Sequence, residues 1–417
     1  MSVVITGIGA VTPVGADAES TWQGLRSGKS GIQRIGYYDV SSFPVQIAGI
    51  CSDFDDGRLP SSEGAKYLHR GERFGVVAGA EAIQSAGIEN GFYDPADVGV
   101  VIGGSVARPE LQEFSDAFAV RQASEGHEMH RFPPEKTLQD SQNTAASEVA
   151  RLAGAQGPVI GVSTACTASA HALGEAMRMM QDGDARMMIA GGFDALTTWC
   201  DLLGFSLLKA LTTEYNDDPE HASRPFDRNR SGFVLGEGSV IMVLEEREAA
   251  EERGATILAE LAGYGSSLNA YRMTDPPPDG GGAVIAMNAA LEEAGLTTSD
   301  VDYVVAHATS TPAGDPSETI AIKRVFGDDA DRIVVTSPKS MTGHTTCAAS
   351  ALNLLAGIYA MRDSVVSPTI NVDDQDPECD LDCVANAARE MEVDVVLVNG
   401  FAFGGTNGAL VAKKYNP

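Results

Sequence analysis

Residues 158–180 read PVIGVSTACTASAHALGEAMRMM, and this stretch decides the fold prediction. An apolar β-branched run, typical of a buried strand, leads through small residues into a segment with helical periodicity. Residues 332–361, RIVVTSPKSMTGHTTCAASALNLLAGIYAM, repeat the order of strand, small-residue loop and long helix. A repeat of this size indicates duplication of a domain-sized α/β unit. The chain is therefore predicted to be α/β, with two similar halves at residues 1–252 and 253–417.

Further apolar runs alternate with helical patterns along the chain, which favours buried parallel strands. The strands predicted in this way are VVITGIG (3–9), VGVVIGG (98–104), ARMMIAGG (185–192), VDYVVAHA (301–308) and VDVVLVNG (393–400). Residues 107–140 are predicted to be the longest irregular stretch of the first half. Duplicated α/β units bring equivalent strand ends side by side, where ligand sites form, so polar residues at those ends are the candidates for function.

The chain is strongly acidic, because 58 Asp and Glu against 29 Lys and Arg give a net charge of −29 over 417 residues. Such a surface repels nucleic acid and anionic lipid, so neither is an expected partner. No apolar run is long enough for a membrane span and no signal peptide is visible, so a cytoplasmic location is expected. The six scattered cysteines are expected to be reduced thiols, and Cys379 and Cys383 lack the second pair that a zinc site needs.

Cys166 is the first candidate for chemistry, because it lies where a predicted strand passes into a predicted helix. A helix N-terminus favours the thiolate and hence nucleophilic attack. The small neighbours Ala165, Thr167 and Ala168 leave room for a substrate. The alternative is a cysteine that only packs in the core.

Two histidines and a lysine are expected near Cys166. His307 ends a predicted strand, and His344 lies in the second repeat at the place that corresponds to the Cys166 region. Lys339 adds a positive charge close to His344. Each of these alone is as readily a core or solvated residue, but the repeat directs all of them to one pocket. The paired glycines of FAFGGTNG (401–408) let backbone N–H groups approach a developing oxyanion.

A nucleotide site is not expected. TGIGAVTPVGA (6–16) looks like a dinucleotide fingerprint, but Thr12 stands where the third glycine belongs and no acidic residue ends a second strand nearby. The other histidines are interpreted as structural or surface residues: His69, His127, His130, His171 and His221.

Over essentially its whole length, the chain resembles the β-ketoacyl-acyl-carrier-protein synthases, the ketosynthases of the thiolase-like superfamily. The stretches that carry the resemblance are VVITGIGAVTPVGADAESTWQGLRSGKSGI (3–32), VSTACTASAHALGEA (162–176), DDPEHASRPFDRNRSGFVLGEG (217–238), AHATSTPAGD (306–315), PKSMTGH (338–344) and NGFAFGGTNGAL (399–410). The resemblance implies a thiolase-like five-layered α-β-α-β-α fold built from two duplicated halves, and a dimer. It also implies formation of carbon–carbon bonds by decarboxylative Claisen condensation.

The resemblance also implies a role for each matching residue. Cys166 would carry the growing acyl chain as a thioester. His307 and His344 would assist decarboxylation of the malonyl unit and stabilise the enolate that attacks. Lys339 would hold His307 electrostatically, and Glu318 would organise that network.

The oxyanion hole and the gate of the acyl pocket are implied in the same way. The backbone N–H groups of Cys166 and Phe403 would form the oxyanion hole, and Phe403 would gate the pocket. The resemblance also assigns Gly404 and Asn269 to this gate.

The substrates would arrive on the phosphopantetheine arm of an acyl carrier protein, so no other cofactor and no metal is expected. Thr309 and Thr311 match the threonines that hydrogen-bond that arm. Because the carrier is itself acidic, docking would need a local basic patch, and Lys66, Arg70 and Arg73 are the candidates. The alternative is a solvated helix face.

Two pathways are compatible with the resemblance. Asn269, where fatty-acid enzymes usually have aspartate, and the polar stretch EKTLQDSQN (135–143) favour the ketosynthase subunit of a type II polyketide synthase. That subunit pairs with a chain-length factor, which is a related subunit without the cysteine. The alternative is a homodimeric fatty-acid β-ketoacyl-ACP synthase II, to which CTASAHALGEA (166–176) is closer. A non-catalytic subunit like the chain-length factor would lack Cys166, and a degradative thiolase would need a second cysteine near the C-terminus.

The chain departs from the family pattern at four positions near the expected pocket. Ala308 and Ala402 stand where the family usually has glycine, Ser231 replaces an aspartate, and Asn353 replaces a glutamate. The expected cysteine, histidines and lysine all remain.

Overall fold

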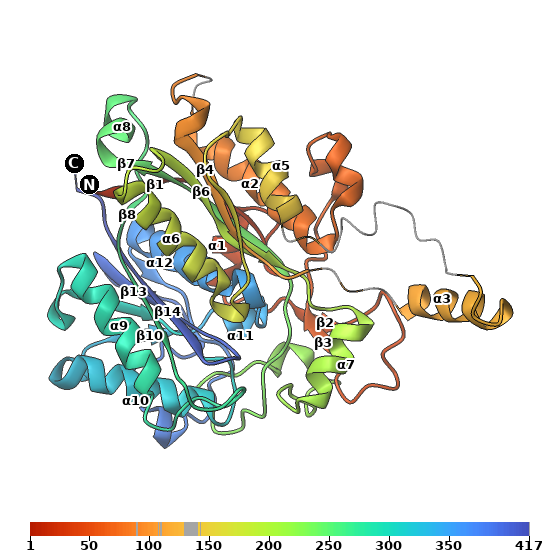
Figure 1. Cartoon of the computed structure of the whole chain (residues 1–417). Coiled ribbons are helices and arrows are strands. Elements are labelled where there is room, and N and C mark those ends of the chain that lie inside the picture. Colours follow the sequence, from red (N-terminus) through yellow and green to blue (C-terminus); the bar gives the residue numbers. More distant parts are fainter. Residues whose placement is uncertain (89–90, 107, 109–110, 129–140, 142, 417) are drawn as a thin grey trace.

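The computed structural model describes residues 1–88, 91–106, 108, 111–128, 141 and 143–416. Its main sheet has ten strands, five from each half of the chain (Figure 1). The first half supplies β1 (Val3–Val11), β4 (Val98–Gly103), β5 (Val159–Val162), β6 (Met187–Asp194) and β7 (Gly238–Glu246). The second half supplies β8 (Ala259–Leu268), β9 (Tyr303–Val305), β10 (Val334–Thr336), β13 (Val395–Phe401) and β14 (Thr406–Lys413).

The strand order confirms the duplication that the repeat predicts. The order across the sheet is β10-β9-β13-β14-β8-β1-β7-β6-β4-β5. In each half, the third strand along the chain lies at the outer edge, followed by the second, fourth, fifth and first. The two halves join where β1 and β8 pair through Val3–Ile5 and Ala259–Leu261.

The expectation of buried parallel strands holds for only part of the sheet. Strand β4 is parallel to β5 and β6, and β9 is parallel to β10 and β13, but β7, β8, β14 and β1 pair antiparallel. The reason is visible in the second half, where residues 402–405 alone connect β13 to β14. A connection of this length makes a hairpin, whereas a parallel pair needs a crossover of a dozen residues or more.

Helices complete the five layers of the thiolase-like fold. Helices α6 (Ala168–Gln181) and α12 (Ala349–Asp363) pack on each other between the two halves of the sheet (Figure 1). Every residue of α12 from Ala349 to Met361 is buried, as expected of a helix enclosed on all sides. One outer layer contains α2 (Arg70–Ala86) and α5 (Asn143–Ala153), and the other contains α9 (Gly281–Ala294) and α10 (Gly314–Phe326).

The remaining elements lie around these layers. They are α1 (Ala18–Arg26), β2 (Ile32–Arg34), β3 (Ile47–Gly49), α3 (Leu111–Ala123), α7 (Trp199–Leu207), α8 (Arg247–Glu252), α11 (Lys339–Thr342), β11 (Val365–Val366) and β12 (Arg389–Glu390). Among the described helices, none has the length and apolar character needed to cross a bilayer.

Helix α3 corrects the prediction that residues 107–140 are irregular. Its apolar residues Leu111, Phe114 and Phe118 follow helical spacing, a signal that the polar composition of the stretch obscured. The helix extends away from the body of the molecule, and all three of these side chains are exposed (Figure 1). Most of the polar stretch 135–143 lies outside the described residues.

Candidate active site

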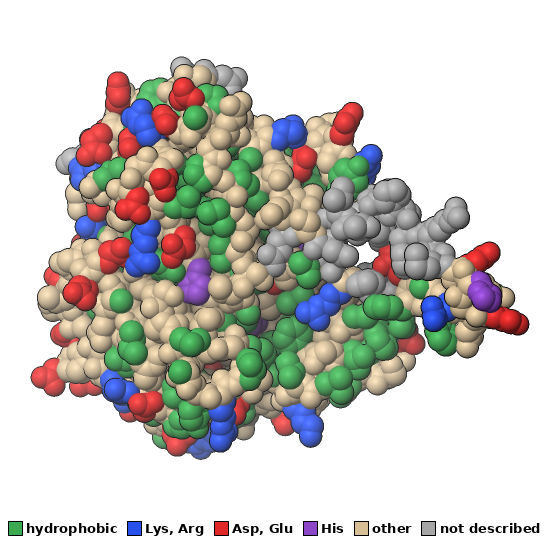
Figure 2. Space-filling view, in the orientation of Figure 1, with side chains coloured by type: hydrophobic (Ala, Val, Ile, Leu, Met, Phe, Trp, Pro, Cys, Tyr) green, Lys and Arg blue, Asp and Glu red, His purple; other side chains and the backbone are tan. Residues whose placement is uncertain are grey.

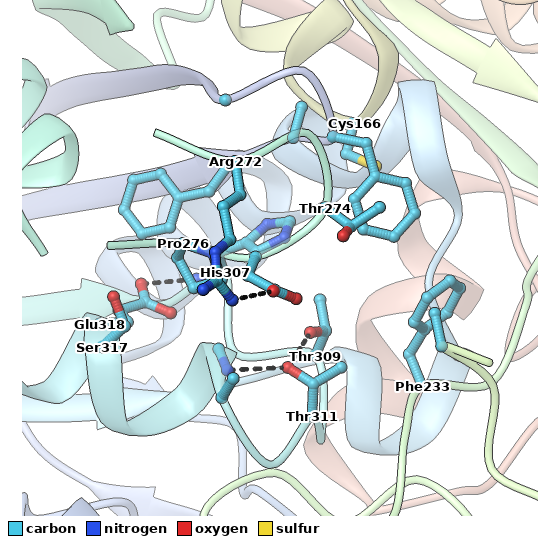
Figure 3. Close-up of a pocket in the computed structure, with 18 of the residues that line it drawn as sticks. Cys166, Phe233, Arg272, Thr274, Pro276, His307, Thr309, Thr311, Ser317 and Glu318 are labelled. Atoms are coloured by element: carbon cyan, nitrogen blue, oxygen red, sulfur yellow. Dashed lines mark hydrogen bonds and ion pairs between the residues drawn. The ribbon is translucent and has the colours of Figure 1, made fainter. Parts of the chain in front are cut away.

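One cavity of about 310 Å³ lies where strand ends of the two halves meet. Cys166 enters it after β5, His307 after β9, His344 after β10 and Phe403 after β13 (Figure 3). Glu318, Asn269, Thr309 and Thr311 also line it. Lys339 is buried just outside the lining, and Gly404 is exposed at the turn beyond Phe403.

Cys166 lies in a tight turn between β5 and α6. The residue before it, Ala165, has a φ of +50°, a left-handed conformation that L-residues rarely adopt. The second repeat contains the same backbone conformation. Thr346 has a φ of +45° immediately before Cys347, at the start of α12. The backbone N–H groups of Cys166 and Phe403 lie close enough to the Cys166 sulfur to lower the pKa of the thiol. Two donors therefore converge on the position where a thioester would form.

The structure contradicts the expectation of a thiolate at Cys166. Burial, together with the negative charge of Asp194, raises the pKa of the Cys166 thiol to about 12. Lys339 and the two N–H donors oppose this shift without overcoming it. The thiol is neutral near pH 7, so its proton must leave when it attacks.

His307 and His344 form an edge-to-face pair, with ring centroids 5.2 Å apart and planes at 84°. Burial, reinforced by the charge of Lys339, holds the pKa of each imidazole well below its ordinary value. Both rings are therefore neutral at physiological pH. Among the described residues, the Nδ1 atom of each ring is buried and has no hydrogen-bond partner.

Glu318 fixes the backbone that carries His307. Its carboxylate accepts hydrogen bonds from the backbone N–H of His307 at 2.8 Å and of Ala308 at 2.7 Å. The amide of Asn399 on β13 donates to the same carboxylate at 2.9 Å. This buried carboxylate therefore ties α10 to the end of β9 and to β13.

The charge of Lys339 affects the pKa values of several other groups in the site. Burial lowers the pKa of its ammonium group to about 8, although the charges of Glu318, Cys166 and Asp315 partly counteract this. Its own charge lowers the pKa of Cys166, His307 and Glu318. A single buried ammonium group thus acts on the nucleophile, on the imidazole pair and on the carboxylate that orients them.

The two threonines line the wall of the cavity below His307. Their hydroxyl oxygens, in Thr309 and Thr311, are 3.3 Å apart, and the N–H of Gly314 donates to Thr311 Oγ1 at 3.1 Å (Figure 3). Between them, Ser310 has a φ of +67°, so this loop must be held from outside.

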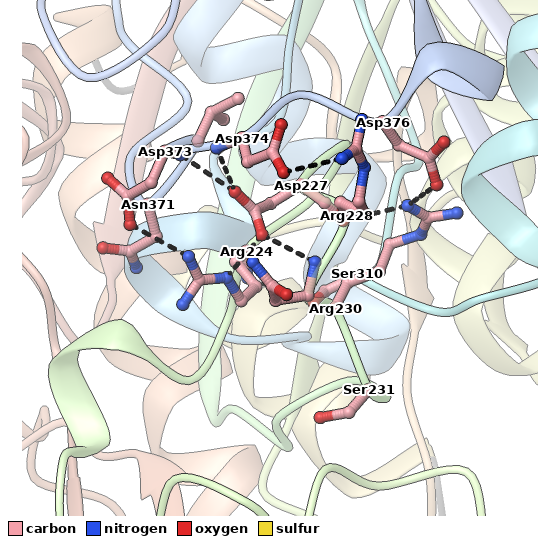
Figure 4. Close-up of polar contacts among 12 residues, drawn as sticks. Arg224, Asp227, Arg228, Arg230, Ser231, Ser310, Asn371, Asp373, Asp374 and Asp376 are labelled. Atoms are coloured by element: carbon pink, nitrogen blue, oxygen red, sulfur yellow. Dashed lines mark hydrogen bonds and ion pairs between the residues drawn. The ribbon is translucent and has the colours of Figure 1, made fainter.

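The support for this loop comes from the central segment of residues 217–238 (Figure 4). Arg230 donates from Nε to the carbonyl of Thr311 at 3.1 Å and from Nη2 to the carbonyl of Pro312 at 3.3 Å. Its Nη1 atom pairs with Asp376 at 2.6 Å. Arg224 and Gly232 donate their backbone N–H groups to Ser310, each at 3.0 Å.

The gate is a hairpin turn held by neighbouring loops. Asn269 donates its backbone N–H to the carbonyl of Gly405 at 2.7 Å, and its side-chain oxygen accepts from Asn407 at 2.9 Å. Gly404 donates to the carbonyl of Met273 at 2.8 Å. Gly404 and Gly405 have φ of +86° and +83°, which explains the paired glycines. The ring of Phe403 packs on Phe233, 6.3 Å away between centroids.

Asp194 lies near the site but was not singled out from the sequence, unlike Ser231 and Asn353. Asp194, at the end of β6, accepts hydrogen bonds from Thr346 and from the N–H of Cys347. It could have been found, because it lies two residues after the predicted strand of residues 185–192. Ser231 lines the cavity and bonds Thr212 at 2.6 Å, whereas Asn353 donates to the carbonyl of Ala306 at 2.9 Å. In the described part of the chain, no group of His, Cys, Asp and Glu is arranged to hold a metal.

In the predicted basic patch, Lys66 lies over the ring of Tyr67, 4.9 Å from its centroid, and both arginines pair with carboxylates. Arg70 makes two hydrogen bonds to the buried carboxylate of Glu237, at 2.8 and 2.5 Å. Arg73 pairs with Asp56 at 3.1 Å and donates to the carbonyl of Leu68. Neither arginine is among the residues that line the cavity.

Comparison with known proteins agrees with this geometry. The model of the β-ketoacyl synthase N-terminal domain matches residues 1–250, and that of the C-terminal domain matches residues 258–373. The 3-oxoacyl-[acyl-carrier-protein] synthase 2 of Vibrio harveyi is 41% identical over 413 residues, covering 99% of this chain and 98% of that protein. The protein of the same name from Coxiella burnetii is 42% identical with the same coverage.

Solved structures give the same result. A type II polyketide ketosynthase, described in complex with its acyl-carrier protein and bound to a hexaketide, superposes with a TM-score of 0.90 at 33% identity. The ishigamide ketosynthase/chain length factor gives a TM-score of 0.90 at 31% identity. Each covers 100% of this chain, which covers 99% of each of them. The chain therefore belongs to the β-ketoacyl synthase family and is an acyltransferase-type condensing enzyme with a thiolase-like fold.

Proposed function

We propose that this chain is a β-ketoacyl-acyl-carrier-protein synthase that condenses a malonyl unit with an acyl chain held on Cys166, as the ketosynthase subunit of a type II polyketide synthase. The observation that carries the condensation is one cavity in which a cysteine with two converging N–H donors faces two neutral imidazoles.

The first step loads the enzyme. The Cys166 sulfur attacks the thioester of an acyl carrier protein, and the thiol proton passes to the leaving pantetheine sulfur. The N–H groups of Cys166 and Phe403 stabilise the tetrahedral oxyanion, because they lie beside the sulfur at which it forms. The product is an acyl thioester on Cys166 and a free carrier thiol.

The second step makes the carbon–carbon bond. A malonyl thioester loses its terminal carboxylate as carbon dioxide, and the electron pair moves into an enolate. Neutral His307 and His344 donate hydrogen bonds to the enolate oxygen. The enolate carbon attacks the thioester carbon on Cys166, the sulfur leaves, and it regains one proton. Thr309 and Thr311 hold the arm, and no step needs a redox group.

The polyketide assignment is supported by Asn269, which lines the cavity and stands where fatty-acid enzymes usually have aspartate. Its side-chain oxygen accepts a hydrogen bond from Asn407 at 2.9 Å, and it adds no carboxylate charge to the cavity.

A homodimeric fatty-acid synthase II is the second candidate. It is favoured by the identities of 41% and 42% to proteins of that name over nearly the full length. In either case the substrates come on an acyl carrier protein, and the chain pairs with a copy of itself or with a chain-length factor.

The deciding experiment is intact mass spectrometry of the carrier protein after incubation with acyl- and malonyl-carrier protein. If the chain alone forms the β-ketoacyl product, the homodimeric synthase is favoured. If product appears only when a homologue without the cysteine is added, the heterodimeric polyketide assignment holds. If neither condition yields product, or Cys166→Ala retains condensation, the proposed function is refuted.

A further inference from the structure

His171 is a buried imidazole near Cys166 that the proposed mechanism leaves without a role. It lies in the first turn of α6, five residues after the nucleophile. Figure 2 shows charged side chains spread over the surface of the molecule, where water solvates them, whereas His171 is only 8% exposed. Burial lowers the pKa of its imidazole, so the ring is neutral near pH 7. A neutral buried ring still needs a partner for each of its nitrogen atoms.

Each ring nitrogen contacts a different segment of the chain. The Nδ1 atom is 2.8 Å from the hydroxyl oxygen of Thr164, in the turn before Cys166. The Nε2 atom is 3.4 Å from the carbonyl oxygen of Asn407 on β14 and 3.3 Å from the hydroxyl oxygen of Ser266 on β8. A carbonyl oxygen only accepts, so Nε2 carries the ring proton and donates the hydrogen bond. Nδ1 is therefore the acceptor, and the Thr164 hydroxyl donates to it.

The two segments that the imidazole joins supply the two N–H groups of the oxyanion hole. Thr164 lies two residues before Cys166, and Asn407 lies four residues after Phe403 in the hairpin of β13 and β14. The hydroxyl of Thr406 in the same hairpin donates to the carbonyl of Thr164 at 3.4 Å. The imidazole therefore lies between the backbone of the nucleophile and the backbone of the gate, and its hydrogen bonds set the spacing of the two.

The second repeat shows the same turn without the histidine. Cys347 stands at the place of the nucleophile there, and the residue before it also has a positive φ. Five residues after Cys347, buried Leu352 stands at the place of His171. The hydroxyl of Thr345, which corresponds to that of Thr164, is buried and has no hydrogen-bond partner in the described part of the chain. The fold therefore accepts leucine at this place, and the imidazole is found in the half that carries the nucleophile.

We propose that His171 is a positioning residue, whose imidazole holds the turn of Cys166 and the hairpin of Phe403 at the spacing at which both N–H groups stabilise an oxyanion. The ring itself does not reach the acyl group, because His171 is not among the residues that line the cavity. Its effect should therefore appear in the rate of acyl transfer and not in binding of the acyl donor. This inference rests on the proposed function.

His171→Leu tests the proposal, because the second repeat shows that leucine fits this place. The reaction is acyl transfer from acetyl-pantetheine to Cys166, followed by intact mass spectrometry of the chain, alone or with a cysteine-less homologue. We expect the limiting rate to fall about tenfold, as when an oxyanion donor is displaced but not removed, and the half-saturating concentration to change less than about twofold. His171→Asn should recover part of the loss, because its amide oxygen can accept from the Thr164 hydroxyl as Nδ1 does.

Alkylation by iodoacetamide separates the oxyanion hole from the reactivity of the thiol. Alkylation uses the same Cys166 sulfur but forms no oxyanion. Its rate in His171→Leu should therefore change less than about threefold, while acyl transfer falls about tenfold.

A matched pair of threonine variants provides the control. Thr164→Val removes the hydroxyl that binds the imidazole and keeps the shape of the side chain, so it should slow acyl transfer as much as His171→Leu does. The double variant should lose no more than either single variant, because both side chains act through one hydrogen bond. Thr345→Val removes the corresponding hydroxyl of the second repeat and should leave acyl transfer unchanged. Thr164→Val also keeps the proposal testable if His171→Leu does not fold.

Other outcomes overturn the proposal in different ways. Unchanged acyl transfer in His171→Leu would remove the imidazole from the reaction, and a rise in the half-saturating concentration alone would assign it to binding. Alkylation that slows in step with acyl transfer would show that His171 supports the thiol and not the oxyanion hole. Losses that multiply in the double variant, or an equal loss in Thr345→Val, would show that the hydrogen bond to Thr164 is not the cause. If the unsubstituted chain accepts no acyl group in either assembly, the proposed function itself has failed.

Discussion

The neutral thiol of Cys166 has a measurable consequence at the scale of one side chain. With a pKa of about 12, its thiolate fraction keeps rising through the range in which an ordinary cysteine reaches its plateau. We expect the rate of alkylation of Cys166 by iodoacetamide to rise about tenfold per pH unit from about pH 7 to about pH 9. Peptide mass spectrometry over time measures this rate. A plateau near pH 7 would show a thiolate stabilised by the helix terminus and would contradict the structure.

Two charges beside the thiol should act in opposite directions. Asp194 raises the pKa of Cys166 and Lys339 lowers it, so Asp194→Asn should speed alkylation at a fixed neutral pH, whereas Lys339→Met should slow it. A shift of one pKa unit in either direction changes the rate about tenfold. The same alkylation assay compares the variants, with circular dichroism as the check on folding. Changes of the same sign in both variants would show that the side chains act through structure and not through charge.

The sequence predicts which residues form the site, but it does not predict the pKa values of their side chains. A strand followed by small residues and a helix locates Cys166 at a strand end, and the repeat brings His307 and His344 to the same cavity. The pKa of the thiol could not be read in this way. It depends on burial by distant segments and on Asp194, which lies on a strand that begins some twenty residues further along the chain.

At the scale of elements, the loop of Thr309 and Thr311 depends on Arg230, which reaches it from a different part of the chain. Arg230→Gln removes the charged fork that holds the carbonyls of Thr311 and Pro312. We expect the KM for malonyl-pantetheine to rise about tenfold, the cost of one or two charge-assisted hydrogen bonds, while the alkylation rate of Cys166 stays unchanged. Arg230→Lys should recover part of the loss.

Arg228→Gln is the matched control, because Arg228 lies in the same segment and loses the same charge. Its guanidinium is exposed and pairs with the exposed carboxylate of Asp374 at 3.0 Å. An exposed ion pair contributes little, so this variant should keep both KM and thermal stability. If Arg230→Gln lowers stability and the alkylation rate in step with KM, Arg230 supports the fold as a whole and not the threonine loop.

Sequence patterns were sufficient to predict some of the helices and strands. The long helices α6 and α12 and most strands of the main sheet follow from apolar runs and helical spacing. The antiparallel direction of pairing was missed, because a buried strand has the same apolar run in either direction. Helix α3 was missed because none of its residues is buried against the described part of the chain, so composition outweighed spacing.

For the whole molecule, the edge of the sheet at β5 is the surface that most needs a partner. Val159 and Ile160 are 41% and 42% exposed on this outer strand, which is an open template for pairing. The same strand leads within a few residues to Cys166, so whatever covers it also steadies the nucleophile turn. The duplication in the sequence predicts the two halves but contains no signal for what lies beyond this edge.

We predict that β5 is paired with a second subunit and that Ile160→Glu weakens this association. A carboxylate forced into an apolar contact loses solvation without a partner, so we expect dimers to dissociate at least about tenfold more readily. Sedimentation velocity over a range of concentrations measures this, for the chain alone or with a cysteine-less homologue. Ile320→Glu on α10, where the side chain is 40% exposed, is the control and should sediment as the unsubstituted chain does. Because β5 positions Cys166, condensation should fall together with the dimer. An Ile160→Glu chain that associates normally would show that the partner binds elsewhere and that β5 remains an open edge.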